Sequence, residues 1–191
     1  MSDASTIDGY LENQMLVAMP GMLDPNFARS VTLMCQHTSE GAIGITINRE
    51  SSVTLGEIFD QLELECDDAS LRDQPVLDGG PVNQDRGFVL HTPREGFDSS
   101  LALAGDIMVT TSRDVLAAIA AGDGPDQYLV ALGYAGWGDG QLEDELRQNA
   151  WLSVPADRAI VFDAPLTDRW NRAVANLGVD ISNLHDVGGR A

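Results

Sequence analysis

Two short β-type segments joined by a tight polar link constrain the fold of this chain most strongly. The segment "SVTLMCQH" (30–37) alternates apolar and polar residues, and "GAIGITIN" (41–48) follows after the three residues "TSE". A link this short predicts an antiparallel hairpin. Strict alternation would place Cys35 and His37 on the same strand face as Val31 and Leu33. The sequence therefore predicts an antiparallel sheet with a thiol and an imidazole side by side.

The rest of the chain predicts further strands mixed with helices. Capping-box pairs mark two helix starts, Thr54 with Glu57 and Thr111 with Asp114, and Pro165 starts the final helix. Acidic residues 63–74 and the segment 92–104 are predicted to be surface loops. Strands are predicted at 14–19, 75–81, 86–91, 106–110, 127–134 and 159–163. The prediction is one mixed α/β domain over 14–191, preceded by a flexible acidic leader over 1–13.

Charge excludes several classes of function. The chain has 30 acidic residues, and its 11 basic residues are all arginine, which gives a net charge of −19. Without lysine there is no Schiff base and no phosphate-loop lysine. An acidic surface repels nucleic acid and anionic lipid, so no direct nucleic-acid contact and no membrane contact are predicted. With no signal peptide and no long apolar run, we expect a cytoplasmic protein with reduced thiols.

The glycine-rich stretch "GYAGWGDG" (133–140) resembles a phosphate-binding turn but lacks its spacing. Gln141 stands where the dinucleotide fingerprint needs a third glycine. Glu143 and Asp144 occupy the first helical turn, where a phosphate would have to lie. The turn is therefore predicted to bend the chain and not to hold a nucleotide. Trp137 either covers the edge of the core or serves as an aromatic platform for a partner.

Cys35 and His37 form the one candidate catalytic pair. An adjacent imidazolium could lower the thiol pKa and make Cys35 a nucleophile or redox sensor. The simpler interpretation is an inert cysteine in the apolar core. A zinc site would have to draw on the scattered residues Cys35, His37, Cys66, His91 and His185, which lack the paired short spacings of such sites. No metal and no cofactor are predicted.

Several loop residues are candidates for a binding surface. Arg86 and Arg113 could bind an anion, although ion pairs with neighbouring aspartates are the usual alternative. The full set of candidates for a ligand or partner surface is Gly79, Gly80, Pro81, Arg86, Arg113 and Trp137.

Six segments, in this order, resemble the AlgH/YqgE family of small bacterial proteins. They are "LVAMPGMLDPNFARSVTLMCQH", "GAIGITINR", "VLDGGPVNQDRGFVLHT", "IMVTTSRDVL", "ALGYAGWGDGQLEDELRQNAWL" and "DRWNRAVANLGVDI". The resemblance implies an α+β fold, with a branched mixed β-sheet curled into a partial barrel and helices packed outside. The family carries the label of a transcriptional regulator, and the resemblance supplies no catalytic residue.

Together these observations favour a cytosolic binding or regulatory protein that acts through a protein partner or a small ligand. Direct DNA contact is disfavoured by the charge and by the lack of a recognisable recognition helix. The alternative is a thiol-dependent enzyme or redox sensor that uses Cys35 with His37.

Overall fold

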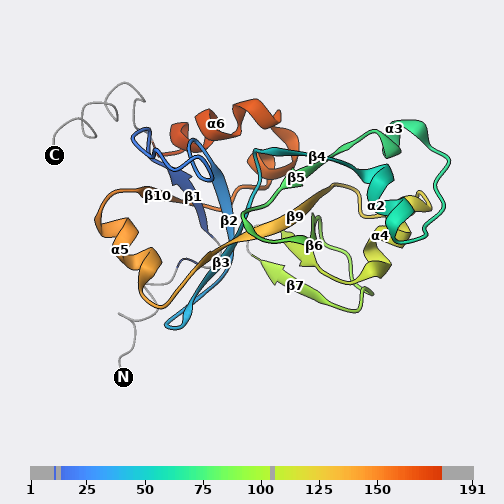
Figure 1. Cartoon of the computed structure of the whole chain (residues 1–191), viewed down its shortest axis with the longest axis horizontal. Helices are drawn as coiled ribbons and strands as arrows, with labels where there is room; N and C mark the ends of the chain where they lie inside the picture. The colour runs from blue at the N-terminus through green and yellow to red at the C-terminus, as the bar shows by residue number, and fades with distance from the viewer. Residues whose placement is uncertain (1–10, 12–13, 104–105, 178–191) are drawn as a thin grey trace.

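The computed structural model describes residues 11, 14–103 and 106–177, and ten strands form one curled sheet with helices outside it (Figure 1). The predicted leader 1–13 lies outside the described residues except for Leu11. The strands are β1 Gln14–Ala18, β2 Val31–Thr38, β3 Gly41–Thr46, β4 Glu50–Thr54, β5 Pro75–Asp78, β6 Val82–His91, β7 Ser100–Leu103, β8 Ile107–Thr110, β9 Tyr128–Trp137 and β10 Trp151–Pro155. The helices are α2 Leu55–Gln61, α3 Ala69–Arg72, α4 Arg113–Ala120, α5 Gln141–Arg147 and α6 Arg169–Ala175.

The sheet branches at β9. Its main order is β10-β1-β2-β3-β9-β6-β8-β7, and β5 also pairs with β9 while β4 pairs with β5. The β5–β9 pair is parallel, and the other pairs in the described residues are antiparallel. This confirms the branched mixed sheet, and its curl forms a half-barrel. The antiparallel hairpin expected from residues 30–48 is present as β2 and β3.

Local capping explains where the outer helices begin. The Thr54–Glu57 capping box is present: the Thr54 N–H donates to Glu57 Oε2 at 2.8 Å, and the Glu57 N–H donates to Thr54 Oγ1 at 3.4 Å. The box expected at Thr111 is absent, because Ser112 takes the N-cap position of α4. The Ser112 hydroxyl donates to Asp114 Oδ1 at 2.6 Å instead of accepting from the helix backbone.

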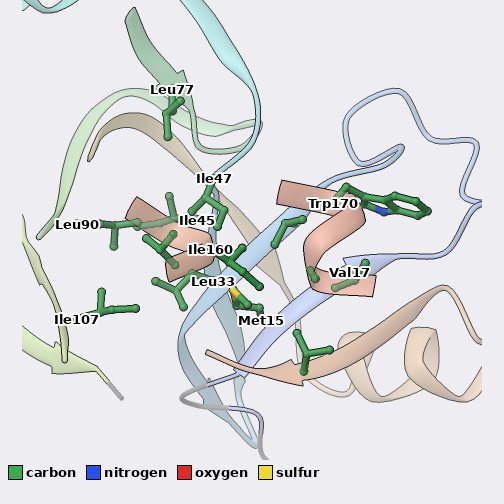
Figure 2. Close-up of a cluster of buried hydrophobic side chains, with 14 of the residues drawn as sticks. Met15, Val17, Leu33, Ile45, Ile47, Leu77, Leu90, Ile107, Ile160 and Trp170 are labelled. Atoms are coloured by element: carbon green, nitrogen blue, oxygen red, sulfur yellow. The ribbon is translucent and has the colours of Figure 1, made fainter. Parts of the chain in front are cut away.

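Three apolar clusters fill the two faces of the sheet. The first contains Leu33, Ile45 and Trp170 and packs α6 against the sheet, as Figure 2 shows for part of it. The second lies under α2 and α4, and the third lies under α5 around Trp137 and Trp151. The predicted apolar side of the last helix is confirmed by its buried residues Trp170, Ala173 and Val174.

Residues 159–163, predicted as the last strand, form a π-helical turn. Periodicity cannot separate a strand from a buried helical turn in a run this short. The last strand is β10, which pairs antiparallel with β1. A 3₁₀ turn, Leu166–Asp168, then leads into α6.

Two segments predicted as loops contain regular structure. The acidic stretch 63–74 includes α3, because Asp68 Oδ1 accepts from the Leu71 N–H at 3.2 Å and caps this short helix. The stretch 92–104 includes the edge strand β7. The residues "VNQD" (82–85), predicted as a loop, belong to β6, whose pairing with β9 shifts register between Val82 and Gly87.

Candidate functional site

A bulge in β2 separates the two members of the predicted catalytic pair. Met34 pairs with Gly44 and Gln36 with Ile43, so Cys35 is the extra residue of the β2–β3 ladder. Cys35 packs against the first apolar cluster, whereas His37 reaches Glu143 of α5, beside the third cluster. The expectation that both side chains share one face is therefore wrong, because the alternation on which it rests is shifted within the strand.

His37 is wholly buried and bonded through both ring nitrogens. Its Nδ1 accepts from the Leu11 N–H at 2.9 Å, and its Nε2 lies 3.0 Å from Glu143 Oε1. Because Nδ1 is an acceptor, this ring is the neutral tautomer that donates from Nε2. Burial raises the pKa of Glu143, but hydrogen bonds from His37 and the backbone, with the charge of Arg147, bring it below its ordinary value. His37 thus ties residue 11 and α5 to the sheet.

The Cys35 thiol lies in an environment that disfavours the thiolate. Burial raises its pKa from 9.0 to about 12. Its Sγ lies 3.8 Å from the Leu33 carbonyl oxygen, which is a weak contact. Cys66 is partly buried against the second cluster, away from Cys35. This environment agrees with the interpretation of Cys35 as a small apolar residue.

Gly79 and Gly80 allow the backbone between β5 and β6 to lie very close to the backbone of β9. A Cβ on Gly79 would lie 2.4 Å from the Gly133 carbonyl oxygen, and one on Gly80 would lie 2.1 Å from the Tyr134 carbonyl carbon. Gly80 also has φ 150°, which favours glycine. Only Pro81 of these three candidates is exposed. Backbone packing therefore explains both glycines in the link between β5 and β6.

The structure brings Trp137 to the core and separates the two candidate arginines. Trp137 is 6% exposed, and its ring packs against Phe27 and donates from Nε1 to Glu145 Oε1 at 3.1 Å. The Arg86 guanidinium lies 5.4 Å from the centre of the Phe88 ring. Neither Arg86 nor Arg113 belongs to any of the ion pairs in the part of the chain that the structure describes, although such pairs were expected.

Arg113 lies apart from Arg86 and Trp137. Its Nη2 donates to the Leu62 carbonyl at the end of α2, at 2.8 Å. It lines neither of the cavities that Cys35, Arg86 and Trp137 line. In Figure 1, β9 runs from the end of the molecule near α4, where Arg113 lies, to the end near α5.

A cavity of about 390 Å³, here called the Cys35 cavity, is the best candidate site. Its polar lining includes Gln36, Arg86, Ser99 and Ser100, and its apolar lining includes Phe88, Leu101 and Val109. Gln36 and Ile43 also line a neighbouring cavity of about 360 Å³ beside Trp137 and Val82. Cys35, Arg86 and Trp137 thus gather around two adjoining hollows.

A chain of hydrogen bonds runs from the rim of the Cys35 cavity into the core. His91 Nδ1 donates to the Thr92 carbonyl at 2.8 Å, so Nε2 accepts from the Thr110 hydroxyl at 2.6 Å. Thr110 Oγ1 in turn accepts from the Ser100 hydroxyl at 2.7 Å. Burial, with the nearby charge of Arg94, lowers the pKa of His91 against the raising effect of the Thr92 bond. The sequence does not indicate Ser100 and Thr110 as site residues, because an isolated serine or threonine belongs to no recognisable motif.

Comparison with known proteins decides the family. The family model described as AlgH-like matches residues 15–182. The chain belongs to the AlgH-like family. A UPF0301 protein from Xanthomonas campestris pv. campestris (strain B100) is 52% identical over 98% of this chain and 100% of its own length. One from Pseudoalteromonas translucida (strain TAC 125) is 49% identical over 95% of this chain and 98% of its own.

Two solved structures share the AlgH-like fold. The solution structure of the AlgH protein from Pseudomonas aeruginosa has a TM-score of 0.79 and 46% identity, covering 100% of this chain and 97% of its own. A protein from Corynebacterium diphtheriae has a TM-score of 0.71 at 22% identity, with 91% of each chain covered, which shows the fold alone. The names of these AlgH-like relatives and structures state no reaction or ligand.

The described part of this AlgH-like structure shows neither a cluster of metal-ligating side chains nor a membrane-spanning helix. Within residues 11, 14–103 and 106–177, no three side chains of the types His, Cys, Asp and Glu come together as a metal site would need. No helix in those ranges is both long enough and apolar enough to cross a bilayer.

Proposed function

We propose that this AlgH-like protein is a cytosolic binding or regulatory protein that holds a small organic ligand in the Cys35 cavity. One observation carries the proposal: an arginine, the Asp98 carboxylate, an amide and hydroxyl groups line one hollow together with apolar side chains. Its volume of about 390 Å³ falls within the range of small-molecule sites. The ligand would carry hydrogen-bond acceptors for Arg86 and Gln36 on an apolar body that contacts Phe88.

The position of the cavity supports a regulatory role. Its walls come from β2 and β3 on one side of β9 in the sheet order and from β6, β7 and β8 on the other. A ligand that contacts both sides favours the curled arrangement of the sheet in which those contacts exist. Binding would thereby stabilise one shape of the surface for a protein partner.

The charge of the protein disfavours direct binding to DNA. The net charge is −19, and Arg72, Arg94 and Arg147 are already paired with aspartates. We expect no shift of duplex DNA in gel electrophoresis at about 0.15 M salt, where surface charges act over only about 8 Å. A specific shift under these conditions would contradict this part of the proposal.

The test of ligand binding uses a variant that fills the hollow. Ser99 is exposed and lines the cavity, so Ser99→Trp blocks it with little strain on the core. Saturation-transfer NMR with a fragment library should give ligands that bind the wild type and not Ser99→Trp. Ser70→Trp, at an exposed serine of α3, is the matched control and should bind as the wild type does. A library in which no ligand distinguishes the two variants contradicts the proposal.

The alternative function, thiol chemistry by Cys35 with His37, has weaker support. The two side chains lie on different faces of β2, and His37 uses both ring nitrogens for Leu11 and Glu143. A thiol whose pKa is raised to about 12 is a poor nucleophile at neutral pH. The alkylation measurement described in the Discussion separates the two functions.

A further inference from the structure

A second cavity, of about 280 Å³, lies where α6 meets the branch of the sheet. Its apolar walls are Leu55, Leu77, Leu129, Val130 and Leu166, and we call it the Arg169 cavity after the one arginine that lines it. Glu50, Gln74 and Tyr128 supply its other polar groups. It shares no lining residue with the Cys35 cavity.

Arg169 is a buried cation with spare hydrogen-bond donors. The residue is 5% exposed. Its Nε donates to the Ala164 carbonyl at 3.2 Å, and its Nη1 donates to the Ile47 carbonyl. A guanidinium has five N–H donors, so these two bonds leave three donors on Nη1 and Nη2 without a partner among the described residues.

The spare donors reach open space. In the described ranges, Ser30 Oγ is the single wholly enclosed side-chain nitrogen or oxygen that lacks a hydrogen-bond partner. Arg169 Nη2 lacks a partner and is therefore not wholly enclosed, and the space that Arg169 lines is the cavity.

No carboxylate in the described part of the chain forms an ion pair with this guanidinium. The arginine–carboxylate pairs among residues 11, 14–103 and 106–177 are formed by Arg72, Arg94 and Arg147 and not by Arg169, although the chain has 30 acidic residues. Glu50 lines the same cavity but is exposed and forms no ion pair with Arg169. Burial lowers the pKa of Arg169, yet a guanidinium stays charged at neutral pH. A buried charge is costly without a counter-charge, so the site gains from an anion.

We propose that the Arg169 cavity binds a small carboxylate with a hydrocarbon tail. The carboxylate accepts hydrogen bonds from the terminal nitrogens of Arg169, and the tail lies against Leu77, Leu129 and Leu166. The cavity volume of about 280 Å³ is at the lower limit for small-molecule pockets and suits a ligand smaller than a drug. The site is independent of the Cys35 cavity and of the function proposed for it.

The lining selects a monocarboxylate over a phosphate. Arg169 is the one positive group among the residues that line the cavity, and Glu50 adds a negative charge. A phosphate dianion would meet this single cation, and the other charged group of the lining, the Glu50 carboxylate, would repel it. A carboxylate needs one bidentate guanidinium, which is the geometry that arginine offers best.

The test compares octanoate with its neutral analogue octanamide on the full-length protein. The readouts are the side-chain Nε–H resonance of Arg169 and the methyl resonances of Leu77 and Leu129 in NMR titrations. We expect saturable shifts with octanoate, with a Kd of about 0.1 to 1 mM for so small a ligand. Octanamide should bind at least about tenfold more weakly, because it loses the charge-assisted hydrogen bonds.

Three variants locate the site. Leu166→Phe fills the cavity without touching the guanidinium and should abolish the shifts while the melting temperature stays near the wild-type value. Arg172→Gln removes an exposed arginine from the same helix and should leave octanoate binding unchanged. Arg169→Gln should also lose binding, and Leu166→Phe keeps the test valid if that variant fails to fold. Equal binding of octanoate and octanamide, or unchanged octanoate binding by Leu166→Phe, overturns the proposal.

Discussion

The Cys35 cavity and the Arg169 cavity differ in how far protein hydrogen bonds and solvent satisfy the polar groups that line them. The polar groups that line the first include the exposed Arg86 and also Ser100, whose hydroxyl is already bonded to Thr110 of the core. The second encloses a guanidinium that two backbone carbonyls satisfy only in part. We therefore expect the first cavity to select ligands by shape and hydrogen bonds and the second to select them by charge.

The largest expected effect is the slow alkylation of Cys35. Burial raises its pKa from 9.0 to about 12. Because each pKa unit lowers the thiolate fraction tenfold below the pKa, the thiolate at pH 8 is about a thousandfold scarcer than in an ordinary thiol. Iodoacetamide should therefore modify the native Cys66→Ser variant at least that much more slowly than free cysteine.

Cys35→Ser is the matched variant that assigns the remaining rate to Cys66. Denaturation of the Cys66→Ser protein should restore an ordinary rate at Cys35. A Cys35 rate in the native protein that titrates below pH 8.5 would reverse the contrast. It would make the Cys35 cavity a reactive site and favour the thiol-dependent function.

The second prediction concerns the stability that the two arginines provide. Arg169→Gln leaves the Ile47 and Ala164 carbonyls without their donor, and we expect a loss of about 2 to 3 kcal/mol in the free energy of unfolding. Arg86→Gln removes only an exposed contact with Phe88 and should cost less than about 1 kcal/mol. Urea denaturation measures both. Equal losses in the two variants would show that burial does not distinguish these arginines.

Much of the fold could be predicted from the sequence because its signals are local. The β2–β3 hairpin follows from a three-residue link, and α2 follows from the Thr54–Glu57 pair. Predictions of secondary structure fail where a local sequence pattern is compatible with both a strand and a helical turn. The run Ala159–Asp163 is apolar enough for a strand, but β10 already pairs with β1, and the run forms a π-helical turn.

The sites were harder to predict because they depend on distant contacts. One bulged residue in β2 places the side chains of His37 and Cys35 on different faces of the strand, and the local sequence does not predict this bulge. Arg169 lies in the last described helix, and its contact with Ile47 spans 122 residues of chain. Nothing in the local sequence distinguishes Arg169 from the exposed Arg172 three residues later. Burial of a charge is a property of the assembled fold.

The third prediction uses pH to test the core behind the Cys35 cavity. Burial lowers the pKa of His91 from 6.5 in the folded protein, so the unfolded chain binds more protons below that pH. Stability from this group is therefore present above pH 6.5 and declines as the pH falls toward the lowered pKa. One titrating group contributes at most about 1.4 kcal/mol per pH unit.

His91→Gln identifies this contribution. The free energy of unfolding should fall less steeply between pH 7 and pH 5 in the variant than in the wild type, as measured by urea denaturation at each pH. Parallel curves for the two proteins would mean that His91 does not stay neutral in the core. In that case the direction assigned to the hydrogen bonds of the Ser100–Thr110–His91 chain is wrong.

The smallest expected effect tests whether that chain reaches the cavity rim. Ser100→Ala removes one neutral hydrogen bond to Thr110 Oγ1 and should cost about 0.5 to 1 kcal/mol. In a Thr110→Val background the acceptor is gone, so the same change should cost nearly nothing. Ser99→Ala is the control, because the Ser99 hydroxyl has no hydrogen-bond partner in the described part of the chain. If Ser100→Ala costs the same in both backgrounds, the serine is not coupled to the core. The Cys35 cavity would then be a surface hollow without the hydrogen-bonded support that distinguishes it from the Arg169 cavity.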